Sequence, residues 1–148
     1  MEIHETSFDS PLGRQAVALR MAVFVDEQRV PADMEVDEHD PYAVHFVAVE
    51  AEKVVGTLRI VELEKAQGPA AKIGRVAVAA PLRGRGIGRQ LMEAAIRHAA
   101  ARRCATCILG AQVPVIGFYE KLGFVAHGPV FDDCGIPHRT MTLKVRAP

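Results

Sequence analysis

Three glycines alternate with three arginines in a short stretch of the chain, at a spacing that suits phosphate binding. The residues are Arg83, Gly84, Arg85, Gly86, Gly88 and Arg89. Because glycine has no Cβ atom, the backbone here can bend sharply and bring its N–H groups close to a ligand. The arginines add positive charge, and a helix that begins here adds unpaired N–H donors and the positive end of its dipole. The stretch therefore predicts a site for the diphosphate group of a ligand.

A strand must precede this loop, and a helix must follow it. The strand is predicted by β-branched residues in an apolar run, at Ile73, Val76 and Val78, and Pro81 interrupts that run. From Gly86 onward, apolar residues recur at helical spacing and form the expected buried face of a long helix: Ile87, Leu91, Ala95 and Ala99. The glycines thus lie at the start of a helix, where an anion can bind.

Two common phosphate loops do not fit this stretch. A P-loop requires lysine and then serine or threonine after its second glycine, whereas Arg89 and Gln90 follow Gly88. A dinucleotide fingerprint requires Gly-x-Gly-x-x-Gly and an acidic residue about 20 positions later. Here the glycines are evenly spaced, and no carboxylate lies near Cys104. A nucleotide hydrolase or a dehydrogenase is therefore disfavoured.

The pattern that does fit is Arg/Gln-x-x-Gly-x-Gly, which Arg83, Gly86 and Gly88 satisfy after the predicted strand. This loop resembles the coenzyme A loop of the GNAT superfamily of N-acetyltransferases. The runs RMAVFVDEQRVP and GIPHRTM further resemble the ElaA/YjcF-like branch of that superfamily.

A second segment, QVPVIGFYEKLGF, resembles another GNAT motif, Asn-x-x-Ala-x-x-x-Tyr-x-x-x-Gly-Phe. Tyr119, Gly123 and Phe124 match that motif, whereas Gln112 replaces its asparagine and Val115 replaces its alanine. The two motifs stand in the order and at the distance that the family requires. The resemblance therefore covers both halves of the chain.

The resemblance implies an N-acetyltransferase that moves an acetyl group from acetyl-coenzyme A, its co-substrate, to a primary amine by direct attack. The acceptor would be a small molecule or a peptide. The implied fold class is α+β, a three-layer GNAT-like fold with a mixed central β-sheet flanked by helices. The alternative function is a non-catalytic acyl-coenzyme A-binding or regulatory module. The residues implied to bind coenzyme A are Val76, Ala77, Val78, Arg83, Gly84, Arg85, Gly86, Ile87, Gly88, Arg89, Gln112 and Phe118.

Two catalytic roles follow from the resemblance and from the chemistry of the reaction. The family uses a tyrosine at the position of Tyr119 to donate a proton to the leaving thiolate, and a phenol with a pKa of about 10 is protonated at neutral pH. An amine with a pKa of about 10.4 must lose a proton to a base. The sequence leaves several candidates for that base open, and Glu27 is our working assignment. The candidates are Glu27, Glu35, His45 and His138.

Residues 26–40 are strongly acidic, with seven carboxylates against the single basic residue Arg29. A calcium loop is excluded, because one that began at Asp33 would have Glu38 at its turn glycine and Val44 at its bidentate glutamate. Two interpretations remain open. The stretch is either a solvated acidic loop or a rim that attracts a cationic acceptor.

Composition and charge exclude several classes of protein. The chain has 148 residues and is 49% hydrophobic and 24% charged, which is ordinary for one globular domain spanning residues 1–148. Since 18 basic residues balance 18 acidic ones, no nucleic-acid or membrane partner is expected. The first residues, MEIHETSFDS, are not a signal peptide, and no run is apolar enough to cross a membrane, so we expect a cytoplasmic protein. The sequence does not predict an oligomeric state.

The three cysteines favour reduced thiols over a metal or redox site. Cys104 and Cys107 form a C-x-x-C pair, but Cys134 and a distant histidine do not complete a zinc site at a compatible spacing. We therefore expect no metal, and we expect buried or partly buried thiols.

The remaining elements follow from periodicity and turn residues. The first helix is predicted to begin with Ser10 as its cap and Pro11 at its first position, and to extend to Val25. Its expected buried face is Leu12, Ala16, Leu19 and Val23. Other strands are expected at residues 2–8, 43–50, 54–63, 106–110, 124–130 and 139–145, with a short helix at residues 114–122.

Overall fold

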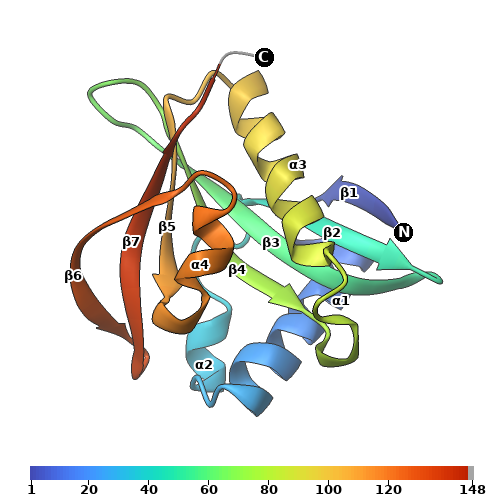
Figure 1. The fold of residues 1–148 in the computed structure, drawn as a ribbon. Helices are drawn as coiled ribbons and strands as arrows, with labels where there is room; N and C mark the ends of the chain where they lie inside the picture. Colours follow the sequence, from blue (N-terminus) through green and yellow to red (C-terminus); the bar gives the residue numbers. More distant parts are fainter. Residues whose placement is uncertain (147–148) are drawn as a thin grey trace. The chain divides into compact units, whose positions relative to one another are not determined.

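The computed structural model describes residues 1–146. Strands and helices follow one another as the sequence predicts (Figure 1). Their order is β1 (Glu2–Thr6), α1 (Pro11–Arg20), a π-helical turn (Met21–Glu27), α2 (Ala32–Glu35), β2 (Val44–Glu50), β3 (Lys53–Leu63), β4 (Ala70–Val78), a 3₁₀ turn (Ala80–Leu82), α3 (Ile87–Ala101), β5 (Thr106–Gln112), a 3₁₀ turn (Val113–Val115), α4 (Ile116–Glu120), β6 (Val125–Asp133) and β7 (Ile136–Lys144).

The strands form one mixed sheet. Seven strands are hydrogen-bonded in the order β1-β2-β3-β4-β5-β7-β6. β4 and β5 run parallel, whereas β1 with β2, β2 with β3, β5 with β7 and β6 with β7 run antiparallel. The predicted fold class, α+β with a mixed central sheet flanked by helices, is confirmed.

The described chain falls into two compact units. The first consists of Met1–Val61 and Arg75–Ala95, and the second consists of Glu62–Gly74 and the chain from Ile96 onward. β3, β4 and α3 each pass from one unit into the other. The assignment of residues 1–148 to a single domain therefore stays a prediction.

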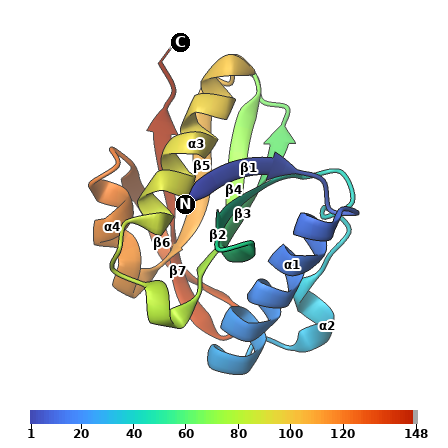
Figure 2. The ribbon, with the colours of Figure 1, turned by 90° about the vertical axis from the view of Figure 1, so that its right-hand side faces the viewer.

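In the first unit, α1 begins as predicted. The Ser10 hydroxyl accepts a hydrogen bond from the Gly13 N–H at 2.9 Å, and Pro11 occupies the first turn. A Cβ at Gly13 would lie 2.3 Å from the Ser7 carbonyl oxygen, so only glycine allows this close approach. Figure 2 shows α1 leading into the π-helical turn, which lies against α2.

The buried face of α1 differs from the prediction. Ala16 and Val23 are buried as expected, but Leu12 and Leu19 are only partly buried, and Arg20 is buried instead. The reason is electrostatic, because Arg20 contacts buried carboxylates on the following segment. Apolar periodicity cannot predict a buried charge that a distant partner neutralises.

Gly56 on β3 allows the start of α3 to pack closely in the first unit. A Cβ at Gly56 would lie 2.8 Å from Ile87 Cγ2 and 2.9 Å from Leu91 Cδ1. The Ala79 N–H also donates to the Val55 carbonyl at 2.9 Å. Both contacts fix the ends of the loop that joins β4 to α3. The predicted buried face of α3 is confirmed, at Ile87, Leu91, Ala95 and Ala99.

The second unit contains a long β6–β7 hairpin, visible at the left of Figure 1. Its strands extend into the segment DDCGIPH, which the sequence predicted as a connecting loop. Only Cys134 and Gly135 lie outside the strands, and both have positive φ, of 51° and 81°. Two residues of positive φ form the tight hairpin turn that matches strand twist. The predicted helix at residues 114–122 is also shorter, since a 3₁₀ turn precedes α4 (Ile116–Glu120).

Two further observations concern the class of protein. Within residues 1–146, no helix is both long enough and apolar enough to cross a membrane. Cys104 and Cys107 are buried thiols, and Cys134 is a partly buried one, as predicted.

Candidate functional site

The loop between β4 and α3 has the backbone that the sequence predicts for an anion site. Gly84 and Gly86 have φ of 83° and 84°, in the left-handed region that favours glycine. A Cβ at either position would meet no atom within 4 Å. The backbone conformation itself, not crowding, therefore requires these two glycines.

The first turn of α3 supplies the N–H donors. The first hydrogen bond into this helix runs from the Gln90 N–H to the Gly86 carbonyl, at 3.1 Å. The N–H groups that precede Gln90 in the first turn have no carbonyl partner within a helix. Together with the positive end of a 15-residue helix, they form a site where an anionic group can bind.

Arg83 connects this loop to the end of the π-helical turn. Its Nη1 and Nη2 donate to Glu27 Oε1 and Oε2 at 2.9 and 3.0 Å, and its Nε donates to the Val78 carbonyl at 3.0 Å. The structure thus brings together Glu27, the residue assigned as the base, and Arg83, one of the residues predicted to bind coenzyme A. Sequence reasoning did not anticipate that these two residues pair with each other.

Arg85 in the loop and Arg89 in the first turn of α3 are held less tightly than Arg83. Arg85 Nη2 lies 3.7 Å from Glu50 Oε1, and Arg89 Nε lies 3.6 Å from Glu93 Oε2. Both arginine side chains are mostly exposed, so these ion pairs are weak. Their guanidinium groups can turn toward a bound phosphate at little cost.

The π-helical turn determines where Glu27 lies. Within this turn the Gln28 N–H donates to the Val23 carbonyl at 3.2 Å, five residues earlier. Such turns insert one residue into a helix and often occur at functional sites. Glu27 is the last residue of the turn, and its side chain is 39% exposed, so solvent and small solutes can reach it.

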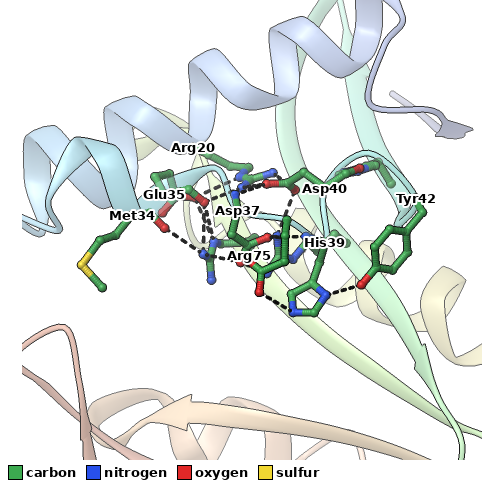
Figure 3. Close-up of polar contacts among 11 residues, drawn as sticks. Arg20, Met34, Glu35, Asp37, His39, Asp40, Tyr42 and Arg75 are labelled. Atoms are coloured by element: carbon green, nitrogen blue, oxygen red, sulfur yellow. Dashed lines mark hydrogen bonds and ion pairs between the residues drawn. The ribbon is translucent and has the colours of Figure 1, made fainter.

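A second group of charges, which we call the buried charge cluster, lies mostly inside the first unit. It consists of Arg20, Glu35, Asp37, Asp40, Arg59 and Arg75. Figure 3 shows the Glu35 carboxylate between Arg20 and Arg75, whose Nε atoms lie 2.9 and 3.1 Å from Glu35 Oε2. Three arginines thus balance three carboxylates. Within residues 1–146, no buried side-chain nitrogen or oxygen lacks a hydrogen-bond partner.

Asp37 and Asp40 are held in the charged state by this cluster. Arg59 donates to both Asp37 carboxylate oxygens at 2.7 and 2.8 Å, and this pair lowers the pKa of Asp37. Burial alone would raise the pKa of Asp40, but hydrogen bonds from Arg20 and from the Asp37 N–H outweigh burial and hold that pKa well below its usual value. Both groups are charged at neutral pH.

These contacts correct the sequence interpretation of residues 26–40. Glu35 and Asp40 are 2% and 0% exposed, and Asp37 is partly buried. They form neither a solvated loop nor a rim for a cationic acceptor, because buried arginines neutralise them. Only the acidic residues that stay exposed can contribute to a rim: Asp26, Glu27, Asp33 and Glu38.

Two of the candidate bases are structural residues of this interior. Glu35 bonds two arginines and is buried. His45 is also buried, its Nε2–H donates to the Asp40 carbonyl at 3.0 Å, and burial lowers its pKa. Neither side chain is accessible to an acceptor amine, which leaves Glu27 and His138.

The second unit contains the other predicted catalytic residue, Tyr119. This residue is 8% exposed, and its ring makes edge contacts with Phe118 and Phe124, at centroid distances of 4.9 and 6.1 Å. Burial raises the pKa of Tyr119 to about 12. The phenol is therefore protonated at any physiological pH and acts only as a hydrogen-bond donor or acceptor.

Gln112 and His138 lie opposite each other on neighbouring strands of the second unit. Gln112 ends β5 and pairs with His138 of β7. The His138 Nδ1–H donates to the Ile136 carbonyl at 2.7 Å, and the ring stacks on Phe131 at 5.7 Å. In the neutral ring, this bond leaves Nε2 as the nitrogen that can accept a proton.

The residue that sequence reasoning missed is Arg75. It lies within β4, directly before Val76, and contacts Glu35 and Asp37 across a sequence separation of about forty residues. No local pattern marks such a partner. The one available signal was the presence of charged Arg75 among the apolar residues Ile73, Val76 and Val78.

The amino-acid sequence of the chain is similar to those of known N-acetyltransferases. The profile of the Acetyltransferase (GNAT) family matches residues 12–124. The chain is 36% identical over 129 residues to the uncharacterized N-acetyltransferase YjcF of Bacillus subtilis. This alignment covers 86% of this chain and 89% of that protein. It is 33% identical over 129 residues to protein ElaA of Escherichia coli, in an alignment that covers 86% of this chain and 84% of ElaA.

Solved structures show the same similarity. The crystal structure of Escherichia coli ElaA matches with a TM-score of 0.84 at 29% identity, covering 96% of this chain and 99% of that one. An acyl-CoA N-acyltransferase from Pseudomonas aeruginosa matches with a TM-score of 0.83 at 31% identity, covering 95% of this chain and 97% of that one. The family match spans well over half of the chain. The chain therefore belongs to the Acetyltransferase (GNAT) family, in the branch that includes YjcF and ElaA.

Proposed function

We propose that this protein is a cytoplasmic N-acetyltransferase that uses acetyl-coenzyme A to acetylate a primary amine of a small-molecule or peptide acceptor by direct attack. The observation that carries the proposal is the loop between β4 and α3, where two left-handed glycines and the start of a helix provide backbone donors. Membership of the family and the similarity to an acyl-CoA N-acyltransferase support an acyl-coenzyme A donor.

The charges and backbone donors of the loop between β4 and α3 suit the diphosphate of coenzyme A. We assign the diphosphate to the backbone N–H groups of residues 84–89, with Arg85 and Arg89 as counter-charges and Arg83 at the rim. Backbone groups of Val76, Ala77 and Val78 are assigned to the pantetheine arm. The Val78 carbonyl already accepts a hydrogen bond from Arg83, so we assign the thioester oxygen to a backbone N–H near Val78.

Tyr119 is assigned as the donor to the leaving thiolate. With a pKa raised to about 12, its phenol is a weaker acid than a thiol, whose reference pKa is about 8.5. Full proton transfer to the thiolate would be uphill, so we expect Tyr119 to stabilise the developing charge through a hydrogen bond. Phe118 and Gln112, in the same unit as Tyr119, are assigned to coenzyme A binding.

Glu27 is assigned as the base. In the reaction the amine nitrogen attacks the thioester carbon, the C–N bond forms, the C–S bond breaks, and the base takes the amine proton. Glu27 is partly exposed, so an acceptor amine can reach its carboxylate, which pairs with Arg83 in the absence of substrate. His138 is the competing assignment, because its Nε2 is the proton-accepting nitrogen of the neutral ring.

A cationic acceptor is part of the proposal. The exposed carboxylates that support it are Asp26, Glu27, Asp33 and Glu38. Surface charges that attract a ligand act through a field that salt screens. If the acceptor is a polyamine or a similar cation, its KM should rise with ionic strength, whereas the KM of a neutral amine should not change.

The direct test is to mix the protein with acetyl-coenzyme A and a panel of amines and to measure the release of free thiol. Tyr119→Phe should lower kcat about 100-fold without weakening coenzyme A binding. The chain has two tyrosines, so Tyr42→Phe, at an exposed position, is the matched control and should leave kcat unchanged. If coenzyme A binds but no amine releases thiol, the non-catalytic binding module replaces the enzyme as the proposal.

The two base candidates are separated by their pH profiles. Glu27→Gln should lower kcat and remove the acidic limb of the profile, whereas His138→Gln should leave that limb in place. The reverse result would transfer the role to His138. Unchanged profiles in both variants would contradict both assignments.

A further inference from the structure

The backbone of β4 is kinked at Arg75. This residue has a φ of 54°, in the left-handed region that side chains other than glycine rarely adopt. Residues in such conformations persist only where their surroundings hold them, and they cluster at functional sites. The kink lies directly before Val76–Val78, the segment assigned to the pantetheine arm.

The Arg75 side chain is bound on several sides. Its Nε lies 3.1 Å from Glu35 Oε2, and its Nη2 donates to the Glu35 carbonyl at 3.1 Å and to Asp37 Oδ2 at 3.3 Å. Glu35 is itself fixed by Arg20, at 2.9 Å and almost without exposure (Figure 3). The guanidinium of a strained strand residue is therefore attached to a buried and fully paired carboxylate of the first unit.

We propose that Arg75 is a positioning residue: its ion pairs with Glu35 and Asp37 hold the kink in β4 and thereby set the backbone groups of Val76–Val78 that receive the pantetheine arm. This inference rests on the proposed function. It gives the buried charge cluster a role in ligand binding besides its role in stability. Arg75 acts through the strand and does not touch the reacting atoms.

The proposal separates two halves of coenzyme A. The nucleotide half, 3′-phospho-ADP, carries the diphosphate and is assigned to residues 84–89, whereas the pantetheine arm is assigned to the strand after Arg75. A variant that releases the kink should therefore lose affinity for whole coenzyme A and keep its affinity for 3′-phospho-ADP. A variant that merely disorders the unit should lose both.

The test is titration calorimetry of coenzyme A and of 3′-phospho-ADP against the wild type, Arg75→Ala and Arg75→Gly. Arg75→Ala lacks the ion pairs and still disfavours positive φ, so we expect coenzyme A affinity about tenfold lower, because small misplacements of binding groups are costly. Glycine adopts positive φ without strain, so Arg75→Gly should recover part of that affinity. Arg103→Ala is the matched control, since Arg103 is an exposed arginine with a φ of 59° in the second unit, and it should change neither affinity.

Three results would overturn the inference. These are an unchanged coenzyme A affinity in Arg75→Ala, an equal loss for both ligands, and a loss in Arg75→Gly as large as in Arg75→Ala. A wild type that binds neither ligand would instead refute the proposed function, and this inference with it. Should Arg75→Ala fail to fold, Arg75→Lys takes its place in both titrations and the same outcomes apply. One ammonium group cannot reproduce the contacts of the guanidinium with both Glu35 and Asp37.

Discussion

Arginine meets carboxylate in two regions of the first unit, and the two regions differ in what the pairing leaves available. In the buried charge cluster, Arg20 and Glu35 are 1% and 2% exposed and 2.9 Å apart. In the loop before α3 and the first turn of that helix, Arg85 and Arg89 are 56% and 65% exposed, and their carboxylates lie 3.7 and 3.6 Å away. The same chemical pair therefore holds the fold in one place and leaves charge free for a ligand in the other. Burial, not residue type, decides which role an arginine has.

The largest effect expected from this difference is on stability, at Arg20. Arg20→Ala leaves Glu35 and Asp40 buried without their main partner, and breaking a buried pair in this way costs about 3–5 kcal/mol. Urea unfolding followed by circular dichroism measures that loss. The control is Arg102→Ala, which removes an exposed pair with Glu62 and should leave the unfolding midpoint unchanged. Equal effects of the two variants would erase the distinction between buried and exposed pairs.

The next effect concerns the loop backbone. Gly86→Ala places a Cβ at a φ of 84°, which costs about 1–2 kcal/mol. It should also weaken coenzyme A binding, since the N–H groups of the turn move. Gly135→Ala is a matched control, because Gly135 has a φ of 81° and equal space around it. It should destabilise the chain similarly without changing coenzyme A affinity. A loss of affinity in Gly135→Ala would contradict a specific role of the loop between β4 and α3 in coenzyme A binding.

A smaller effect should appear in the pH dependence of the free energy of unfolding, through titratable groups of the buried region. Burial lowers the pKa of His45 below its ordinary value of 6.5, so the unfolded chain binds a proton that the folded chain does not. The free energy of unfolding should therefore be largest above about pH 6.5 and fall as the pH drops from there toward the lowered pKa. Asp37 and Asp40, whose pKa values are also lowered, add a separate loss below about pH 4.

His45→Gln should remove the first of these two losses and keep the second, because glutamine does not titrate and can still donate to the Asp40 carbonyl. Chemical unfolding across this pH range measures both. His127→Gln, at an exposed position, is the control and should retain the wild-type profile. A wild-type stability that is flat between pH 7 and pH 5 would contradict the assignment of a buried neutral His45.

The smallest effect on stability is expected at Arg89. Arg89→Ala removes an exposed pair with Glu93 at a spacing of four residues, which contributes about 0.3–0.5 kcal/mol. Coenzyme A affinity should nevertheless fall several-fold and lose part of its salt dependence, which calorimetry at two ionic strengths would measure. A variant with wild-type affinity and salt dependence would exclude Arg89 from the diphosphate site.

The same comparison explains what the sequence could predict. The loop was predictable because its signals are local: Gly84 and Gly86 mark positive φ, and Ile87 and Leu91 mark the helix that follows. The Ser10 cap followed from a similar short-range pattern, whereas the order of strands and helices was predicted more from the resemblance to the GNAT superfamily than from periodicity.

The buried charge cluster could not be predicted in this way. Arg20 is separated from Glu35 by 15 residues and from Asp40 by 20, and Arg75 is about forty residues from Glu35. Read locally, Arg20 is a surface residue of an amphipathic helix, and Asp40 belongs to an acidic loop. Only the folded chain shows that these charges neutralise one another. The same limit applies to the pair of Glu27 and Arg83.

The π-helical turn at Met21–Glu27 implies that a deletion can redirect a side chain without replacing any functional group. Removing one residue, such as the exposed Ala22, would return the segment to ordinary α-helical pitch and rotate everything beyond the deletion by about 100° around the helix axis. The carboxylate at the end of the turn would remain in the chain, yet face a different direction. The extra residue thus determines the direction in which the Glu27 carboxylate points.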